Sequence, residues 1–159
     1  MTGPEITLRD VIESDLLTLF EHQLDPAANW MAAFTAKDPS NWDDFKRRWD
    51  NILTEPKITK RAILADDQLV GSLVCYGSPT DREIGYWLGR QHWGKGFATL
   101  AVRQFIKLIP ERPLYARVVK DNPASLRVLQ KTGFKVVSET RGYANARQAE
   151  VEEYLLVLA

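Results

Sequence analysis

The chain has 159 residues, the length of one domain, with 45% hydrophobic and 26% charged residues, which excludes a disordered chain. Its 21 basic residues balance 21 acidic ones, which argues against a protein that mainly coats nucleic acid or an anionic membrane. Cys75 is the sole cysteine and there are two histidines, so neither an intramolecular disulfide nor a zinc cluster is expected. We find no signal peptide and no apolar run of about 18 residues, and these absences predict a soluble, cytoplasmic protein.

The hydrophobic pattern is helical in the first third of the chain and then alternates between strands and helices. Up to residue 57 it predicts a strand over 6–9, a helix from Ser14 to Leu24, a loop with Trp30 and Phe34, and a helix from Pro39 to Leu53. Later it predicts strands over 61–65, 69–76 and 83–88, a helix over 97–109, a strand over 114–119, a helix over 122–132, and strands over 134–140 and 151–158 around a polar loop. The order βααβββαβαββ predicts an α/β fold with a mixed sheet and helices on its faces.

Two glycines, Gly94 and Gly96, lie in a turn that joins a predicted strand to a buried helix. The first N–H groups of such a helix have no intrahelical partner, and the helix dipole adds positive potential, so a phosphate fits there. The glycine spacing and the lack of Gly-Lys-Ser/Thr exclude a Walker P-loop and a Rossmann fingerprint. Taken alone, the turn is also compatible with a tight connection that binds nothing.

Four motifs of the second half resemble those of the GNAT superfamily of acyl-CoA-dependent N-acetyltransferases, and in particular its RimJ/RimL-type branch. They are Gly-Tyr-Trp-Leu at 85–88, Trp-Gly-Lys-Gly-Phe-Ala at 93–98, Asn-Pro-Ala-Ser at 122–125 and Lys-Thr-Gly-Phe at 131–134. The resemblance implies one domain over residues 1–159 with splayed central strands, which moves an acetyl group from acetyl-CoA to a primary amine by direct attack in a ternary complex. A non-catalytic acyl-CoA sensor or scaffold remains an alternative, as does an enzyme that binds a nucleotide phosphate.

The resemblance also implies which residues bind acetyl-CoA, with no metal. The family motif Gln/Arg-x-x-Gly-x-Gly/Ala fits residues 91–96 or residues 93–98, and the second register places the helix start as the family has it. In both registers the pyrophosphate meets backbone N–H groups of Trp93, Gly94, Lys95, Gly96, Phe97 and Ala98. Leu88, Gly89 and Arg90 are implied to offer backbone groups to the pantetheine arm and the acetyl carbonyl, in a slot between the splayed strands.

Two residues of the 122–125 motif are candidates for the site. Asn122 is typical of an N-cap before Pro123, and the resemblance implies that it also contacts the cofactor. Ser125 is implied to lie near the sulfur, which makes it the candidate general acid for the departing thiolate.

The general base is open. Glu83 lies on the strand where some GNAT enzymes carry a catalytic glutamate, but the preferred motif register points to Arg82, and one residue changes the face of a strand. Glu152 and Glu153 on the last strand are further candidates. The sequence is also compatible with an acceptor amine of low pKa, which would lose its proton through water without a dedicated base.

The acceptor pocket is implied to lie beside the first helices, so Trp30 and Phe34 are candidate substrate-binding residues, with Tyr143 on the opposite wall. His92 is expected to be exposed in its turn. Leu100 stands where RimJ/RimL-type sequences often have glutamate, which leaves the acceptor open among protein N-termini, lysines, polyamines, amino acids and aminoglycosides. A homodimer is a family expectation, whereas nucleic-acid and membrane partners are not expected.

Overall fold

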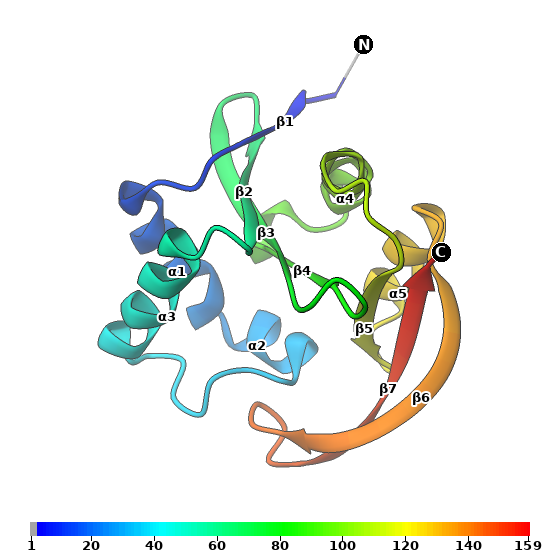
Figure 1. Cartoon of the computed structure of the whole chain (residues 1–159). Helices are drawn as coiled ribbons and strands as arrows, with labels where there is room; N and C mark the ends of the chain where they lie inside the picture. Colours follow the sequence, from blue (N-terminus) through cyan, green and yellow to red (C-terminus); the bar gives the residue numbers. More distant parts are fainter. Residues whose placement is uncertain (1–2) are drawn as a thin grey trace.

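The computed structural model describes residues 3–159. It shows a seven-stranded mixed sheet with helices on both faces (Figure 1). The strands are β1 (Ile6–Arg9), β2 (Thr59–Ala65), β3 (Gln68–Tyr76), β4 (Glu83–Leu88), β5 (Leu114–Val119), β6 (Lys135–Ala144) and β7 (Ala149–Leu158). The helices are η1 (Glu13–Asp15), α1 (Leu16–Leu24), α2 (Pro26–Ala32), α3 (Trp42–Thr54), η2 (Arg90–His92), α4 (Phe97–Leu108) and α5 (Pro123–Lys131). The sheet order is β1-β2-β3-β4-β5-β7-β6, which confirms the predicted fold class.

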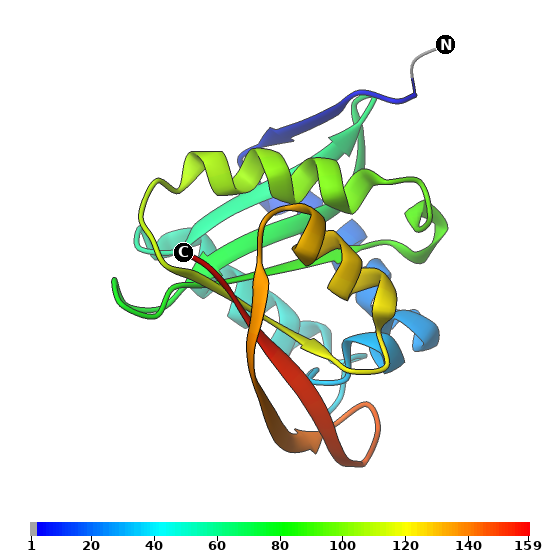
Figure 2. The same cartoon turned by 90° about the vertical axis from the view of Figure 1, so that its right-hand side faces the viewer.

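Helices α4 and α5 cover one face of the sheet, and α1 and α3 cover the other (Figures 1 and 2). Successive residues of β3 serve these two layers in turn: Leu73 packs in the core beneath α4, and Val74 packs against the cluster of α1 and α3. On α4, Val102 and Phe105 are fully buried, so this helix is fixed firmly on the sheet. None of the helices in residues 3–159 is long and apolar enough to cross a membrane.

The central parallel strands β4 and β5 separate almost at once. Glu83 and Tyr115 form the one paired position between them among the described residues, whereas β5 pairs with β7 along its whole length. This confirms the predicted splay. Because the two strands are parallel, their separated C-terminal ends lie at the same end of the sheet, where α4 and α5 begin.

Three sequence expectations about the elements are wrong. The segment expected as a loop after Asp25 is helix α2, because Asp25 accepts a hydrogen bond from the Ala28 N–H (2.9 Å) and Pro26 fits the first helical position. The pair Asp25–Pro26 therefore ends one helix and starts the next. Ser14 caps no helix, since it lies inside η1, and residues 141–144 continue β6 where a loop was expected.

Candidate active site

The turn before α4 leaves a row of backbone donors without acceptors. Gly94 and Gly96 have φ values of 74° and 79°, in the left-handed region that favours glycine, and a Cβ added at either would meet nothing within 4 Å. No N–H group of residues 94–98 donates a hydrogen bond to another group of residues 3–159. The N–H of Trp93 donates to the Arg90 carbonyl, so Trp93 is not one of these donors. This open row of N–H groups at a helix N-terminus fits an anion.

The second helix beside the gap between β4 and β5 is α5, whose N-cap is Asn122. The Asn122 Oδ1 accepts the Ser125 N–H at 3.2 Å, which confirms the predicted N-cap, and its Nδ2 reaches the carbonyl of Met31 on α2 at 3.5 Å. The cap leaves the Ser125 side chain free to point elsewhere.

Gly89 has both backbone groups engaged inside the protein. Its N–H donates to the Val70 carbonyl at 3.0 Å, and its carbonyl accepts the His92 N–H at 2.9 Å. A Cβ at Gly89 would stand 2.7 Å from the His22 ring, so glycine is required for close packing. The structure therefore gives Gly89 a structural role and does not support it as a donor to the pantetheine arm.

Alternation along β4 identifies the groups that face the gap. Since Gly89 bonds to β3, the backbone groups of Leu88 and Tyr86 are directed to the β5 side. The carbonyl of Leu88 already accepts the Trp93 indole N–H at 3.1 Å. The N–H groups of Tyr86 and Leu88 are thus the strand donors that a pseudo-peptide in the gap would meet.

Tyr86 is a functional candidate that the sequence analysis missed. Its hydroxyl lies 2.6 Å from the Ser125 Oγ, so one hydrogen bond joins β4 to α5. Burial raises the pKa of the Tyr86 phenol to about 12, which keeps it protonated and able to donate. The period-two pattern of Ile84, Tyr86 and Leu88 is the signal that places this side chain on the face of α5.

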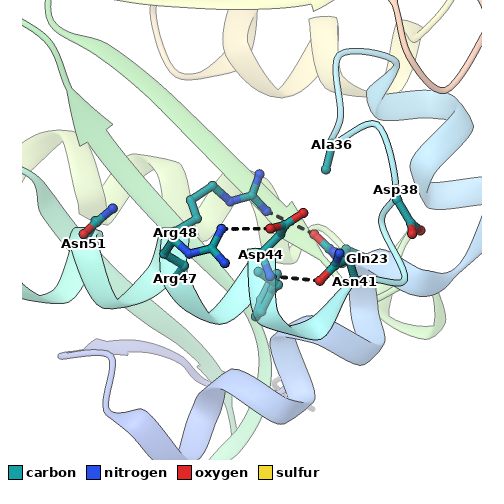
Figure 3. A pocket seen from close by; sticks show the side chains of 9 residues that line it. Gln23, Ala36, Asp38, Asn41, Asp44, Arg47, Arg48 and Asn51 are labelled. Carbon is teal, nitrogen blue, oxygen red and sulfur yellow. Dashed lines mark hydrogen bonds and ion pairs between the residues drawn. The ribbon is translucent and has the colours of Figure 1, made fainter.

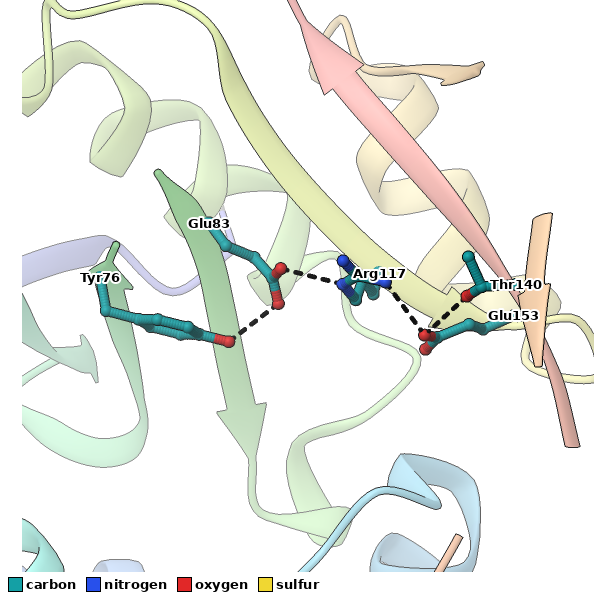
Figure 4. A network of polar contacts seen from close by, with 5 residues as sticks. All are labelled: Tyr76, Glu83, Arg117, Thr140 and Glu153. Atoms are coloured by element: carbon teal, nitrogen blue, oxygen red, sulfur yellow. Dashed lines mark hydrogen bonds and ion pairs between the residues drawn. The ribbon is translucent and has the colours of Figure 1, made fainter. Parts of the chain in front are cut away.

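Glu83 lies at the closed end of the gap, in a network of polar contacts (Figure 4). Its carboxylate accepts the Tyr76 hydroxyl at 2.8 Å and the Arg117 Nε at 3.0 Å. Leu88 lies five positions further along β4, a distance of about 16 Å. Glu83 is held by its partners, and this geometry favours a structural role over that of a base near Leu88.

The two other candidate bases are also in ion pairs. Glu153 accepts from Arg117 at 3.3 Å and from the Thr140 hydroxyl at 3.0 Å, so one guanidinium bridges two carboxylates (Figure 4). Glu152 pairs with Lys120 at 2.6 Å. Each carboxylate that the sequence offered as a base is therefore engaged.

Phe34 and Tyr143 do not face each other across a pocket, as the two opposite walls expected from the sequence would require. The Arg147 guanidinium stacks over the Trp30 ring at 4.4 Å, and Phe34 packs against Gly142 of β6. Tyr143 follows Gly142 in the same strand, so its side chain points to the other face. Trp30 and Phe34 both meet the segment that carries β6 and β7, while Tyr143 lies apart from Phe34.

His92 is buried, contrary to the expectation that it is exposed. Its ring lies 6.2 Å from that of His22, which is buried as well, and His92 Nε2 and His22 Nδ1 have no hydrogen-bond partner among the described residues. Burial lowers the pKa of both imidazoles; the Lys95 ammonium lowers that of His92 further, and the cost of a second charge beside His92 lowers that of His22. Both rings are thus kept neutral between α1 and the end of β4.

We expect the free energy of unfolding to fall as the pH drops below about 6.5. Histidines in the unfolded chain have their ordinary pKa near that value, so below it the unfolded state binds more protons, at a cost of up to about 1.4 kcal/mol for each histidine at pH 5.5. Urea unfolding at pH 7.5 and 5.5 measures the difference. The double variant His22→Gln, His92→Gln is the control and should lose this slope, and equal slopes in both proteins would contradict the assignment.

The fold and the site together define a class of enzyme. Residues 5–135 match the family model of the acetyltransferase (GNAT) domain, so the chain belongs to the GNAT acetyltransferases, which are transferases. An uncharacterized N-acetyltransferase of Bacillus licheniformis, p20, is 27% identical over 165 residues, which cover 96% of this chain and 92% of that protein.

Solved structures share the fold at low identity. The spermidine N-acetyltransferase of Vibrio cholerae, in complex with CoA and spermine, aligns with a TM-score of 0.79 at 15% identity, over 96% of this chain and 95% of that one. The ribosomal-protein-alanine N-acetyltransferase of Brucella melitensis aligns with a TM-score of 0.80 at 14% identity, over 95% of this chain and 98% of that one. At such identity the likeness shows the fold alone.

Among residues 3–159 no group of three or more His, Cys, Asp or Glu side chains is placed to hold a metal ion.

Proposed function

We propose that this acetyltransferase binds acetyl-CoA in the gap between β4 and β5 and transfers the acetyl group directly to a primary amine in a ternary complex. The observation that carries the proposal is the gap itself, which opens from Glu83 towards two helix N-termini and is bordered by unpaired donors of residues 94–98. Acetyl-CoA supplies the activated acyl group. The N–H groups of residues 94–98 would hold its pyrophosphate, and those of Tyr86 and Leu88 would pair with the pantetheine arm and polarise the acetyl carbonyl.

Ser125 is the proposed general acid. The two hydroxyls of Ser125 and Tyr86 lie 2.6 Å apart, and with the Tyr86 phenol as the donor the serine proton would be available for the departing thiolate. Tyr86 would act through Ser125 as a positioning residue, since it fixes the hydroxyl at the mouth of the gap.

The acceptor is proposed to be an amine of low pKa, such as a peptide N-terminus. At pH 7 a lysine-like amine costs roughly 4.6 kcal/mol to deprotonate, whereas a peptide α-amine costs about 1.1–1.4 kcal/mol. Because Glu83, Glu152 and Glu153 are all ion-paired, the second cost suits this site better. The RimJ/RimL-type motifs support the same choice, and one relative in fold is named for transfer to a protein alanine.

The release of CoA thiol in the presence of acetyl-CoA tests the proposal. The amine panel should contain an alanyl peptide, a lysine side-chain analogue, a polyamine and an aminoglycoside. We expect turnover with the peptide above all, with a pH dependence of kcat/KM that follows the pKa of each acceptor. Tight binding of CoA, with no release of CoA thiol from acetyl-CoA whichever amine is added, would favour the alternative of a non-catalytic acyl-CoA sensor.

A further inference from the structure

A surface cavity of about 320 Å³ lies between the end of α1, the segment before α3, and α3 itself (Figure 3). This volume suits a small ligand or the end of a peptide. The cavity is lined by Gln23, Ala36, Asp38, Asn41, Asp44, Phe45, Arg47, Arg48 and Asn51.

Arg48 is the unusual member of this lining. Its guanidinium donates one hydrogen bond, to the Gln23 Oε1 at 3.3 Å, and lies over the Phe45 ring at 5.8 Å from the ring centre. Gln23 is itself buried and fixed by a bond from its amide to the Pro39 carbonyl (2.7 Å). Within residues 3–159 no carboxylate pairs with Arg48, while the adjacent Arg47 pairs with Asp44 at 2.9 Å. Arg48 is an exposed residue that borders the cavity, and its guanidinium, oriented by Gln23, has most of its donors unused within the described residues.

The charges around Arg48 limit what it can bind. Arg47 and Asp44 neutralise each other, and one oxygen of Asp38 accepts both the N–H and the hydroxyl of Ser40. The remaining charge of Asp38 would repel a dianion such as phosphate about twice as strongly as a monocarboxylate, and a carboxylate matches the planar fork of a guanidinium. A monocarboxylate therefore suits this site better than a dianion does.

One turn of α1 lies between the cavity and the end of β4. Gln23 lines the cavity, and His22, its neighbour in the helix, packs against Gly89. The same junction is tied by the Asp25–Arg90 ion pair (3.5 Å). A substrate bound at Arg48 would have to be extended, so that it passes this turn and reaches the donors of Tyr86 and Leu88.

We propose that Arg48 binds a carboxylate of the acceptor, so that the preferred substrates are peptide-like α-amines with a carboxylate a few residues away. This inference rests on the proposed acetyl transfer to an amine. The carboxylate could come from a free C-terminus or from an acidic side chain, and both present the same group to the guanidinium.

Two series of alanyl peptides test the proposal and separate these sources. The first has two to four residues with a free or an amidated C-terminus, and the second consists of amides with glutamate at position 2, 3 or 4. We expect one length or position to raise kcat/KM by about tenfold over its uncharged counterpart, as for a hydrogen-bonded charge pair. Arg48→Gln should remove the preference, and Arg48→Lys should restore only part of it because the fork is lost.

Arg103→Gln, on the opposite face of the sheet, is the matched control and should keep the preference. Calorimetry with the acetylated peptides measures the same discrimination without turnover, so the site can be judged even if no amine is acetylated. Acetylation of all peptides irrespective of carboxylates, with Arg48→Gln unchanged, would overturn the role of Arg48 and leave the proposed function standing. If no peptide is acetylated but binding still depends on the carboxylate and on Arg48, the site stands and the proposed reaction fails.

Discussion

Replacement of Gly96 by aspartate is expected to weaken CoA binding on the order of 100-fold, because a fixed negative charge would stand about 4 Å from the pyrophosphate. The space above Gly96 is open and its N–H neighbours have no internal acceptor, so the new side chain would enter the anion site and leave the core unchanged. Isothermal titration with CoA measures the loss.

Gly96→Asn is the control for this experiment. Asparagine has the shape of aspartate and also tolerates the left-handed conformation of residue 96 (φ 79°), so the two variants differ mainly in charge. We expect the asparagine variant to lose far less affinity. Equal affinities of the two variants would show that the pyrophosphate does not lie at this helix N-terminus.

Replacement of Ser125 by alanine is expected to lower kcat by about 10²–10⁴-fold, the usual contribution of a general acid. The affinity for CoA should change little, because Asn122 caps α5 through the Ser125 N–H, which alanine retains. Steady-state kinetics and calorimetry on the same preparation measure both quantities. Full activity in the alanine variant would return Ser125 to a structural role in the first turn of α5.

The role of Tyr86 can be separated from that of Ser125 by a double-mutant cycle. If the phenol acts through the serine hydroxyl, Tyr86→Phe lowers kcat in the parent enzyme but has little further effect in the Ser125→Ala background. A loss of equal size in both backgrounds would mean that Tyr86 acts on the substrate directly. The closed-end residue Glu83 offers a contrast, since Glu83→Gln should cost kcat less than about tenfold if it is structural.

The local sequence by itself determines where several helices and strands of this protein begin. Helix α4 begins at Phe97 and α5 at Pro123, as the glycine turn and the Asn-Pro pair predict, because caps and turns depend on neighbours in the chain. The alternation of residues 83–88 likewise predicts β4. The motifs at these junctions also predict the GNAT family, which the family model confirms.

Tertiary structure decided the features that depend on partners distant in sequence. The Tyr86–Ser125 bond joins residues 39 positions apart, and the Arg117–Glu83 pair joins residues 34 apart. The burial of His92 follows from the approach of His22 on α1, and the Arg48–Gln23 hydrogen bond joins residues 25 positions apart. No local pattern encodes such contacts, because they form only when the sheet order brings separate elements together and water is excluded between them.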